Sequence, residues 1–194
     1  MRIVAGEWKG RRIAAPKGMA VRPTPERVRE AWMSILQDDL PLARVFDLFA
    51  GTGALGLEAL SRGAEFVDFV ENDPRSLRTL EENIRALDAG ERCTIHRSDA
   101  LDFASRLTSP GAPHASRLPV NAARLSPNGA GLSPLVIAFA DPPYRLGLAA
   151  RLASLWLAAP FSTILGVEHE ATETLPEGGD RRRYGDTALT IYRT

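Results

Sequence analysis

The sequence predicts an α/β fold in which helices cover both faces of a mostly parallel sheet. From Arg44 onward, apolar runs alternate with stretches of helical periodicity, and this order implies right-handed crossovers between parallel strands. A chain of 194 residues with 44% hydrophobic residues is long enough for one domain with a sizeable core. The expected strands are residues 45–49, 66–71, 92–97, 135–140, 163–169 and 184–192, and the expected helices are residues 54–62, 74–87, 99–107 and 147–158.

Two features precede the first expected strand. The first 20 residues predict a short hairpin or an extended arm, punctuated by Gly6, Gly10 and Gly18. Thr24 and Pro25 then suit the cap and the first position of a helix. The apolar residues that follow recur at helical spacing and predict a stripe that faces the core, formed by Val28, Ala31, Trp32, Ile35 and Leu36.

The later elements are marked with different strength. Residues 74–87 predict a helix with one apolar side, which Leu77, Leu80, Ile84 and Leu87 form, whereas residues 92–97 predict only a weak strand. Residues 163–169 and 184–192 are interpreted as two strands that close the sheet. Residues 108–134 hold five prolines, three glycines and no acidic residue, so we expect a long surface loop or a disordered insertion there.

Cysteine content and apolar run length exclude several classes of protein. Cys93 is the only cysteine, so an intrachain disulfide is impossible and we expect neither a zinc site nor any other metal site. A reducing, cytoplasmic setting is therefore expected. No segment has the apolar length of a signal peptide or of a membrane span, so secretion and membrane insertion are not expected.

The net charge of zero conceals a basic N-terminal region. Residues 1–46 carry nine basic and five acidic groups, a net charge of +4, so the remaining residues sum to −4. This clustering predicts contact with a nucleic acid, although a solvated arm remains the alternative. The groups expected to contact phosphates all precede the first core strand: Arg2, Lys9, Arg11, Arg12, Lys17 and Arg22.

A glycine-rich turn lies between the first expected strand of the sheet and the helix that follows it. Gly51-Thr52-Gly53-Ala54-Leu55-Gly56 matches the dinucleotide-binding pattern, in which glycines permit a tight turn and the approach of a ligand to bare backbone. Glu71 ends the next strand, where a carboxylate can accept both hydroxyl protons of a ribose. The pair predicts an adenosine-containing ligand.

Asp47 distinguishes between adenosine ligands. A nicotinamide cofactor needs its pyrophosphate at the helix N-terminus, where a neighbouring acid such as Asp47 is unfavourable. An amino-acid tail with a sulfonium fits better, because Asp47 could hold its ammonium group directly or through water. Asp99 follows the third strand and could reach the adenine amino group, although capping the next helix is an equally good role.

The tetrapeptide Asp141-Pro142-Pro143-Tyr144 follows the apolar strand at residues 135–140. An exocyclic amine of a nucleobase is a poor nucleophile, because its lone pair is delocalised into the ring. Hydrogen bonds to the Asp141 carboxylate and the Pro142 carbonyl would orient the amine, and Tyr144 offers a face on which an extruded base can stack. The alternative for the tetrapeptide alone is an ordinary turn after a strand.

Three sets of residues together make the chain resemble the RsmD family of bacterial methyltransferases. They are Arg2 to Arg11 with Arg22-Pro23-Thr24, then Asp47 to Ala64, and then Asp141 to Tyr144. The family modifies the N2 amine of a guanine in small-subunit (16S) ribosomal RNA. The resemblance implies a class I, Rossmann-like fold of seven strands, S-adenosyl-L-methionine as donor, and a small ribosomal subunit as partner.

The resemblance also implies roles for individual residues and a division of the chain. Asp47, Gly51 and Gly53 would line the donor site, Glu71 would hold the ribose, Asn72 and Asp99 would flank the adenine, and Asp141, Pro142, Pro143 and Tyr144 would hold the guanine. Residues 1–21 would form a basic arm and residues 22–194 the methyltransferase domain of a monomer. The insert at 108–134 and the small residues Ala138 and Ala140 depart from the family pattern, which affects access to the site and its packing.

Rival functions share only part of this pattern. A DNA adenine-N6 methyltransferase could use the same tetrapeptide, but it would need target-recognition sequence that 194 residues scarcely hold. A nicotinamide oxidoreductase would use the glycine loop but not Asp141 to Tyr144. A noncatalytic ribosome assembly factor would have no use for intact donor and acceptor motifs.

Overall fold

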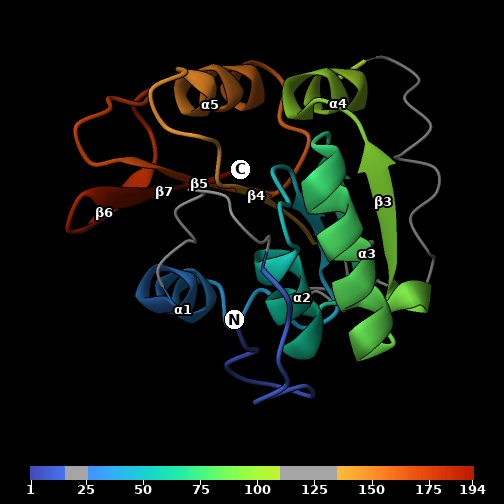
Figure 1. Cartoon of the computed structure of the whole chain (residues 1–194). Coiled ribbons are helices and arrows are strands. Elements are labelled where there is room, and N and C mark those ends of the chain that lie inside the picture. The colour runs from blue at the N-terminus through green and yellow to red at the C-terminus, as the bar shows by residue number, and fades with distance from the viewer. Residues whose placement is uncertain (16–25, 110–134) are drawn as a thin grey trace, which may run out of the picture.

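A seven-stranded sheet forms the middle of the molecule (Figure 1). The structure, a computed structural model, describes residues 1–15, 26–109 and 135–194. The strands are β1 (Arg44–Asp47), β2 (Phe66–Glu71), β3 (Cys93–Arg97), β4 (Val136–Ala140), β5 (Ile164–Glu170), β6 (Asp180–Tyr184) and β7 (Thr187–Arg193). They lie in the order β3-β2-β1-β4-β5-β7-β6; β7 pairs antiparallel with β5 and with β6, and the other pairs are parallel. The predicted mostly parallel sheet of seven strands is confirmed.

Helices cover both faces of this sheet. They are α1 (Glu26–Ile35), α2 (Ala54–Ser61), α3 (Pro74–Leu87), α4 (Ala100–Leu107) and α5 (Leu148–Ala158), with a short 3₁₀ turn, η1 (Gly90–Arg92), before β3. Apolar residues of α1, α2 and α3 form one core, and those of α4 and α5 form a second core on the opposite face. Figure 1 shows α4 and α5 above the sheet, with α1 and α2 below it. Trp32 of α1 is fully buried, as its stripe predicted.

The sheet brings the carboxyl ends of β1, β2 and β4 to one edge. Asp47, the last residue of β1, is in register with Phe69 of β2 and with Phe139 of β4. The chain leaves β1 toward β2 on one side, whereas β4 lies on the other side, so the strand order reverses at β1. In open α/β sheets this switch point is where ligands bind.

The interpretation of residues 184–192 as one strand is wrong. The structure has two antiparallel strands there, β6 and β7, joined by a tight turn in which Gly185 has a φ of 71°. The charged run Asp180-Arg181-Arg182-Arg183 lacks the apolar alternation of a half-buried strand, because β6 is an exposed edge strand. The Gly185-Asp186 pair is a typical hairpin turn and was the available signal.

The N-terminal residues form a hairpin that packs against α2. Ile3, Trp8 and Ile13 are buried in the same core as α1 and α2, and an isolated bridge pairs Arg2 with Arg12. Sequence reasoning expected a hairpin or an extended arm here and did not predict that one side of it would be buried. The structure shows that residues 1–15 are packed against the domain body along much of their length.

Polar contacts from α2 hold this hairpin in place. The fully buried carboxylate of Glu58 accepts hydrogen bonds from the amides of Val4 at 2.8 Å and Ala5 at 3.0 Å. Gly6 adopts a φ of 82° where a Cβ would lie 1.8 Å from the carbonyl oxygen of Ser61, so only glycine fits. The turn of the hairpin therefore docks at the C-terminal end of α2, whereas Ala14 shares Asn83 of α3 with Thr52 of the loop after β1.

Three expectations lie outside the described residues. They are the boundary at residue 21, the cap at Thr24 and Pro25, and all but two residues of the insert at 108–134. Among the helices that the structure describes, none has the length and apolar character needed to cross a membrane.

Candidate active site

The loop after β1 approaches β2 through backbone conformations that suit glycine. Gly51 and Gly53 have φ values of 53° and 80°, and Gly53 caps the start of α2. A Cβ on Gly53 would lie 2.4 Å from a methyl group of Leu80, and one on Gly56 would lie 2.3 Å from the ring of Phe69. At Gly56, α2 therefore packs closely on β2.

Gly51 differs from the two packed glycines. A Cβ on Gly51 would approach no described atom closer than the carbonyl oxygen of Phe49, at 4.0 Å. The space beside Gly51 is therefore open, which is what a ligand lying against bare backbone requires.

Glu71 joins the end of β2 to this loop. One carboxylate oxygen accepts a hydrogen bond from the amide of Gly51 at 2.8 Å. The other oxygen accepts from the amides of Asn72 at 2.8 Å and Asp73 at 2.7 Å. A carboxylate has about four lone-pair positions, so these three bonds orient Glu71 and leave room for a further donor.

Asp47 lies below the loop and is buried. Its carboxylate accepts a hydrogen bond from the amide of Gly56 at 3.0 Å, which ties the end of β1 to α2. Burial is the main cause that raises the pKa of Asp47 to about 7; the hydrogen bond from Gly56 opposes it, and the charges of Asp141 and Glu71 add to it. The donor motif and the tetrapeptide therefore share one electrostatic environment, rich in carboxylates and suited to a cationic ligand.

Asn72 and Asp99 lie at the ends of β2 and β3 and are exposed. Asp99 caps α4, because one of its carboxylate oxygens accepts from the amides of Leu101 at 2.8 Å and Asp102 at 3.1 Å. This confirms the capping role that the sequence also allowed. Both of these hydrogen bonds go to the same carboxylate oxygen of Asp99.

The tetrapeptide follows β4 directly. Pro142 is buried, Pro143 is exposed, and Asp141 and Tyr144 are half-buried. The Tyr144 hydroxyl donates to the Glu168 carboxylate at 3.2 Å and lies 2.9 Å from the Thr187 hydroxyl. Burial raises the pKa of Tyr144 to about 12, so its hydroxyl stays protonated and can donate at neutral pH.

Sequence reasoning missed Glu168 and Thr187. Glu168 lies in β5 and is almost fully buried, and its second oxygen is 3.4 Å from the indole nitrogen of Trp32. The available signal was a carboxylate inside an otherwise apolar strand, since charged residues are rarely buried without a partner. Its contacts with Trp32 and Tyr144 could not be identified from the sequence, because these residues come from α1 and the tetrapeptide.

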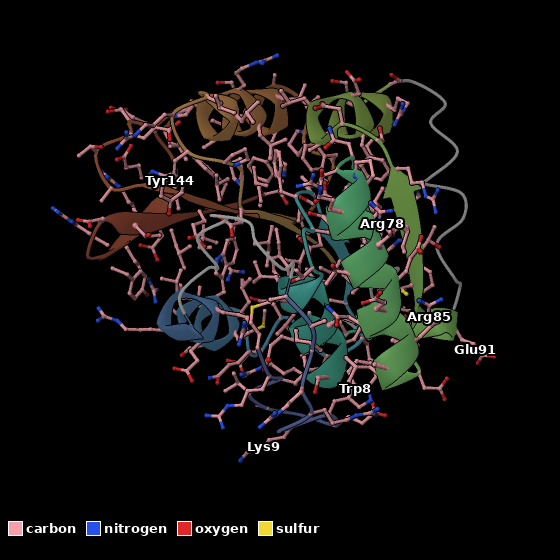
Figure 2. The ribbon with its side chains drawn as sticks, viewed as in Figure 1. Trp8, Lys9, Arg78, Arg85, Glu91 and Tyr144 are labelled. Atoms are coloured by element: carbon pink, nitrogen blue, oxygen red, sulfur yellow. The ribbon has the colours of Figure 1, made fainter. Side chains whose placement is uncertain are left out.

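The basic residues of the hairpin lie away from these motifs. Arg2, Lys9, Arg11 and Arg12 are exposed, and Arg11 donates to the carbonyl of Ala86 at the end of α3. Figure 2 shows Lys9 and Trp8 at the bottom of the molecule and Tyr144 at its upper left. Lys17 and Arg22 lie outside the described residues.

The two described histidines have structural partners. His96 lies 2.8 Å from the carboxylate of Asp68, and His169 is buried with one ring nitrogen 2.9 Å from the Thr190 hydroxyl. Burial lowers the pKa of His169, which favours its neutral form. Both therefore contribute to packing of the sheet.

Comparison with known proteins places the chain in a family. Residues 1–116 match the family model described as "Conserved hypothetical protein 95". The chain is 34% identical over 181 residues to ribosomal RNA small subunit methyltransferase D of Escherichia coli K12, an alignment that covers 91% of this chain and 78% of the relative.

Solved structures share the fold over most of the chain. A hypothetical protein of Thermus thermophilus matches with a TM-score of 0.74 and 30% identity, covering 100% of this chain and 99% of the other. An RNA methyltransferase of Salinibacter ruber in complex with S-adenosyl-L-homocysteine matches in fold, with a TM-score of 0.56 and 11% identity over 88% of this chain and 92% of the other. With its seven-stranded class I methyltransferase fold, the chain belongs to the RsmD family, the family of ribosomal RNA small subunit methyltransferase D.

Proposed function

We propose that this chain transfers the methyl group of S-adenosyl-L-methionine to the exocyclic N2 amine of a guanine in small-subunit (16S) ribosomal RNA. One observation carries the proposal: the glycine loop and the tetrapeptide meet at one edge of the sheet. There, the charges of Glu71 and Asp141 both act on Asp47 and raise its pKa. The family, and its relative named as a ribosomal RNA small subunit methyltransferase, support the choice of ribosomal RNA as substrate. We propose a cytoplasmic monomer acting on the small subunit.

The residues at the carboxyl ends of β1, β2 and β3 fit this donor. Gly51 leaves open backbone for it, and Glu71 is held so that a lone pair can accept from the ribose hydroxyls. Asn72 and Asp99 would flank the adenine, Gly53 would shape the loop, and Asp47 would attract the ammonium group. The bound donor supplies an electrophilic methyl group on a sulfonium.

The tetrapeptide would prepare the acceptor. Asp141 and the Pro142 carbonyl would accept hydrogen bonds from the guanine amine, so that its lone pair points toward the methyl group. The nitrogen–carbon bond forms as the sulfur–carbon bond breaks, and the amine releases one proton to solvent. Pro143 stiffens the turn, and Tyr144 offers a ring face for an extruded base.

The hairpin would capture the RNA. Arg2, Lys9, Arg11 and Arg12 lie on the exposed side of a hairpin whose apolar side is buried, so their charges face solvent on a rigid support. Contacts of this kind neutralise phosphates without reading the base. Lys17 and Arg22 extend the same proposal along the chain.

The direct test uses small subunits from a bacterium that lacks this gene. The purified chain is incubated with these subunits and labelled S-adenosyl-L-methionine, and the label is mapped by nuclease digestion and mass spectrometry. We expect label on the N2 position of one guanine of 16S RNA, and none with Asp141→Ala. Label on adenine N6 of a DNA duplex, or RNA binding without any transfer, would favour a rival function.

A further inference from the structure

Both ends of the tetrapeptide are held by contacts from distant parts of the chain. At its far end, the Tyr144 hydroxyl contacts Glu168 of β5 and Thr187 of β7, which lie 24 and 43 residues further along. The ring of Tyr144 is therefore tied at its tip to two neighbouring strands of the sheet.

Glu168 also reaches the near end of the tetrapeptide through Trp32. The indole N–H of Trp32 donates to the second Glu168 oxygen at 3.4 Å. The ring of Trp32 packs edge-on against Phe139 of β4, at a centroid distance of 5.2 Å. Phe139 precedes Asp141 by two residues, so one buried carboxylate links the residues on both sides of the turn.

Trp32 is tightly packed, with little room for its ring to move. Gly166 of β5 faces its ring, and a Cβ at that position would lie 2.0 Å from a Trp32 ring atom. Trp32 has no exposed surface, and Glu168 is 2% exposed. Buried hydrogen-bonded groups of this kind resist movement, because any displacement leaves a polar group without its partner.

We infer that Glu168 is a positioning residue, which acts through the Tyr144 hydroxyl to hold the Tyr144 ring in the orientation needed for the acceptor base. This inference rests on the proposed function, in which Tyr144 stacks on the guanine. A fixed ring would raise the fraction of bound bases whose amine faces the methyl group. The contribution of Glu168 therefore appears in turnover and leaves the donor site unchanged.

A double-mutant cycle tests this dependence. Glu168→Gln leaves one acceptor oxygen for two donors, and Tyr144→Phe removes the hydroxyl while keeping the ring. We expect Glu168→Gln to lower kcat for ribosomal RNA about 10-fold with Tyr144 present and less than about 2-fold in the Tyr144→Phe background. The KM for RNA and the Kd for S-adenosyl-L-methionine should change by less than about 2-fold in either background.

Glu170→Gln provides the matched control. It makes the same change on the same strand, at a half-buried residue paired with Arg145 on the surface, and should leave kcat unaltered. Equal losses from Glu168→Gln in both backgrounds would overturn the inference, because Glu168 would then act on the fold or on the base directly. Unchanged kcat in every variant would overturn it as well.

A second measurement does not depend on activity. The chain has three tyrosines, so ring-labelled tyrosine gives three NMR signals for the carbon that bears the hydroxyl, and Tyr144→Phe assigns one of them. Glu168→Gln should shift the Tyr144 signal and leave Tyr184 and Tyr192 in place. No shift, or equal shifts in all three, would overturn the contact. If the parent chain transfers no methyl group to RNA, the proposed function fails, whereas this spectrum still decides whether Glu168 holds Tyr144.

Discussion

The proposed donor half and the proposed acceptor half of the site are built in different ways. The donor half is a backbone structure: the carboxylate of Glu71 binds the amides of Gly51, Asn72 and Asp73, all within 20 residues of it. The acceptor half is a side-chain structure, in which Tyr144 depends on Glu168 and Thr187 from other strands. Trp32, which completes it, lies 136 residues from Glu168.

This difference predicts how each half responds to mutation. The loop packed on β2 should shift as a whole when one of its residues is substituted, so such substitutions should reduce donor affinity. In the acceptor half, whose side chains come from several elements, single substitutions should leave donor affinity unchanged and lower turnover. Substitutions in the two halves should therefore separate binding from catalysis.

The largest effect is expected at Asp141. Asp141→Ala should lower methyl transfer about 1,000-fold or more, while donor affinity stays near that of the parent, because the interaction it removes orients the acceptor in the transition state. Asp141→Asn should retain more activity than alanine, since an amide oxygen still accepts a hydrogen bond. Single-turnover rates and donor calorimetry decide the matter, and parallel losses in both would assign Asp141 to the donor half.

The next largest effect is expected at Glu71. Glu71→Ala leaves three backbone amides and the ribose hydroxyls without an acceptor, so donor binding should weaken by about 1–3 kcal/mol, roughly 5- to 150-fold. Glu82→Ala, at an exposed residue of α3, is the matched control and should bind donor normally. Calorimetry with S-adenosyl-L-methionine measures both, and tight binding of NAD by the parent would contradict the assignment of the donor.

Gly56, where α2 packs on β2, should affect both stability and donor affinity. Gly56→Ala would place a methyl group 2.3 Å from the Phe69 ring, and such overpacking should reduce stability by about 1–3 kcal/mol and donor affinity with it. Gly90→Ala is the control, because a Cβ there meets no described atom within 4 Å. Chemical denaturation should find Gly90→Ala within about 0.5 kcal/mol of the parent. Equal stability of both variants would mean that α2 is free to shift on β2.

The same comparison explains what the sequence could predict. The glycine loop, Glu71 and the tetrapeptide are local patterns at strand ends, and the order of strands and helices brings them together. Glu168 and Thr187 belong to no such pattern, because their role depends on which strand lies beside β4. The sheet order places β5 there and inserts β7 next to it, and no periodicity within β5 or β7 contains that information.

The hairpin illustrates a second limit of sequence reasoning. Its basic residues predict an exposed arm, and they are exposed, but Ile3, Trp8 and Ile13 recur every five residues, a spacing that matches neither the period of a strand nor that of a helix. Burial comes from Glu58 and Ser61 of α2, whose polar groups bind the hairpin backbone. The charge pattern could predict a basic surface, but it could not predict that the hairpin carrying this surface is packed against α2.

The hairpin should affect substrate capture and neither half of the site. Changing Lys9, Arg11 and Arg12 together to alanine should lower the salt slope of log affinity for subunits by roughly 0.7 to 0.9 for each phosphate that the variant no longer neutralises. Donor affinity should stay constant, and the methylation rate should recover partly at lower salt. Removing Arg78, Arg85 and Arg151 instead makes the same change in charge at exposed residues of α3 and α5. An equal change in slope for both triple variants would mean that total charge, and not the hairpin, holds the RNA.

The smallest effect is expected at Asp47, where the two halves meet. The ordinary pKa of an aspartate is 3.8, and burial together with Asp141 and Glu71 raises that of Asp47 to about 7 in the folded chain. A carboxyl whose pKa is raised on folding stabilises the fold below its unfolded pKa and loses that contribution as pH rises through the folded value. The parent should therefore become less stable between about pH 4 and pH 7.

Asp47→Asn removes this titration while keeping an oxygen that can accept from Gly56. One pKa unit is worth about 1.4 kcal/mol, and relaxation of the site offsets part of the shift. We therefore expect the free energy of unfolding of the variant, relative to that of the parent, to rise by about 1–2 kcal/mol from pH 5 to pH 8. Denaturant titrations at both pH values measure this difference. Donor affinity should rise with pH over the same range in the parent, as the ionised Asp47 attracts the ammonium group, and stay flat in Asp47→Asn. A pH-independent difference in stability would show that Asp47 is already ionised, and that the donor and acceptor halves are less strongly coupled than their shared edge implies.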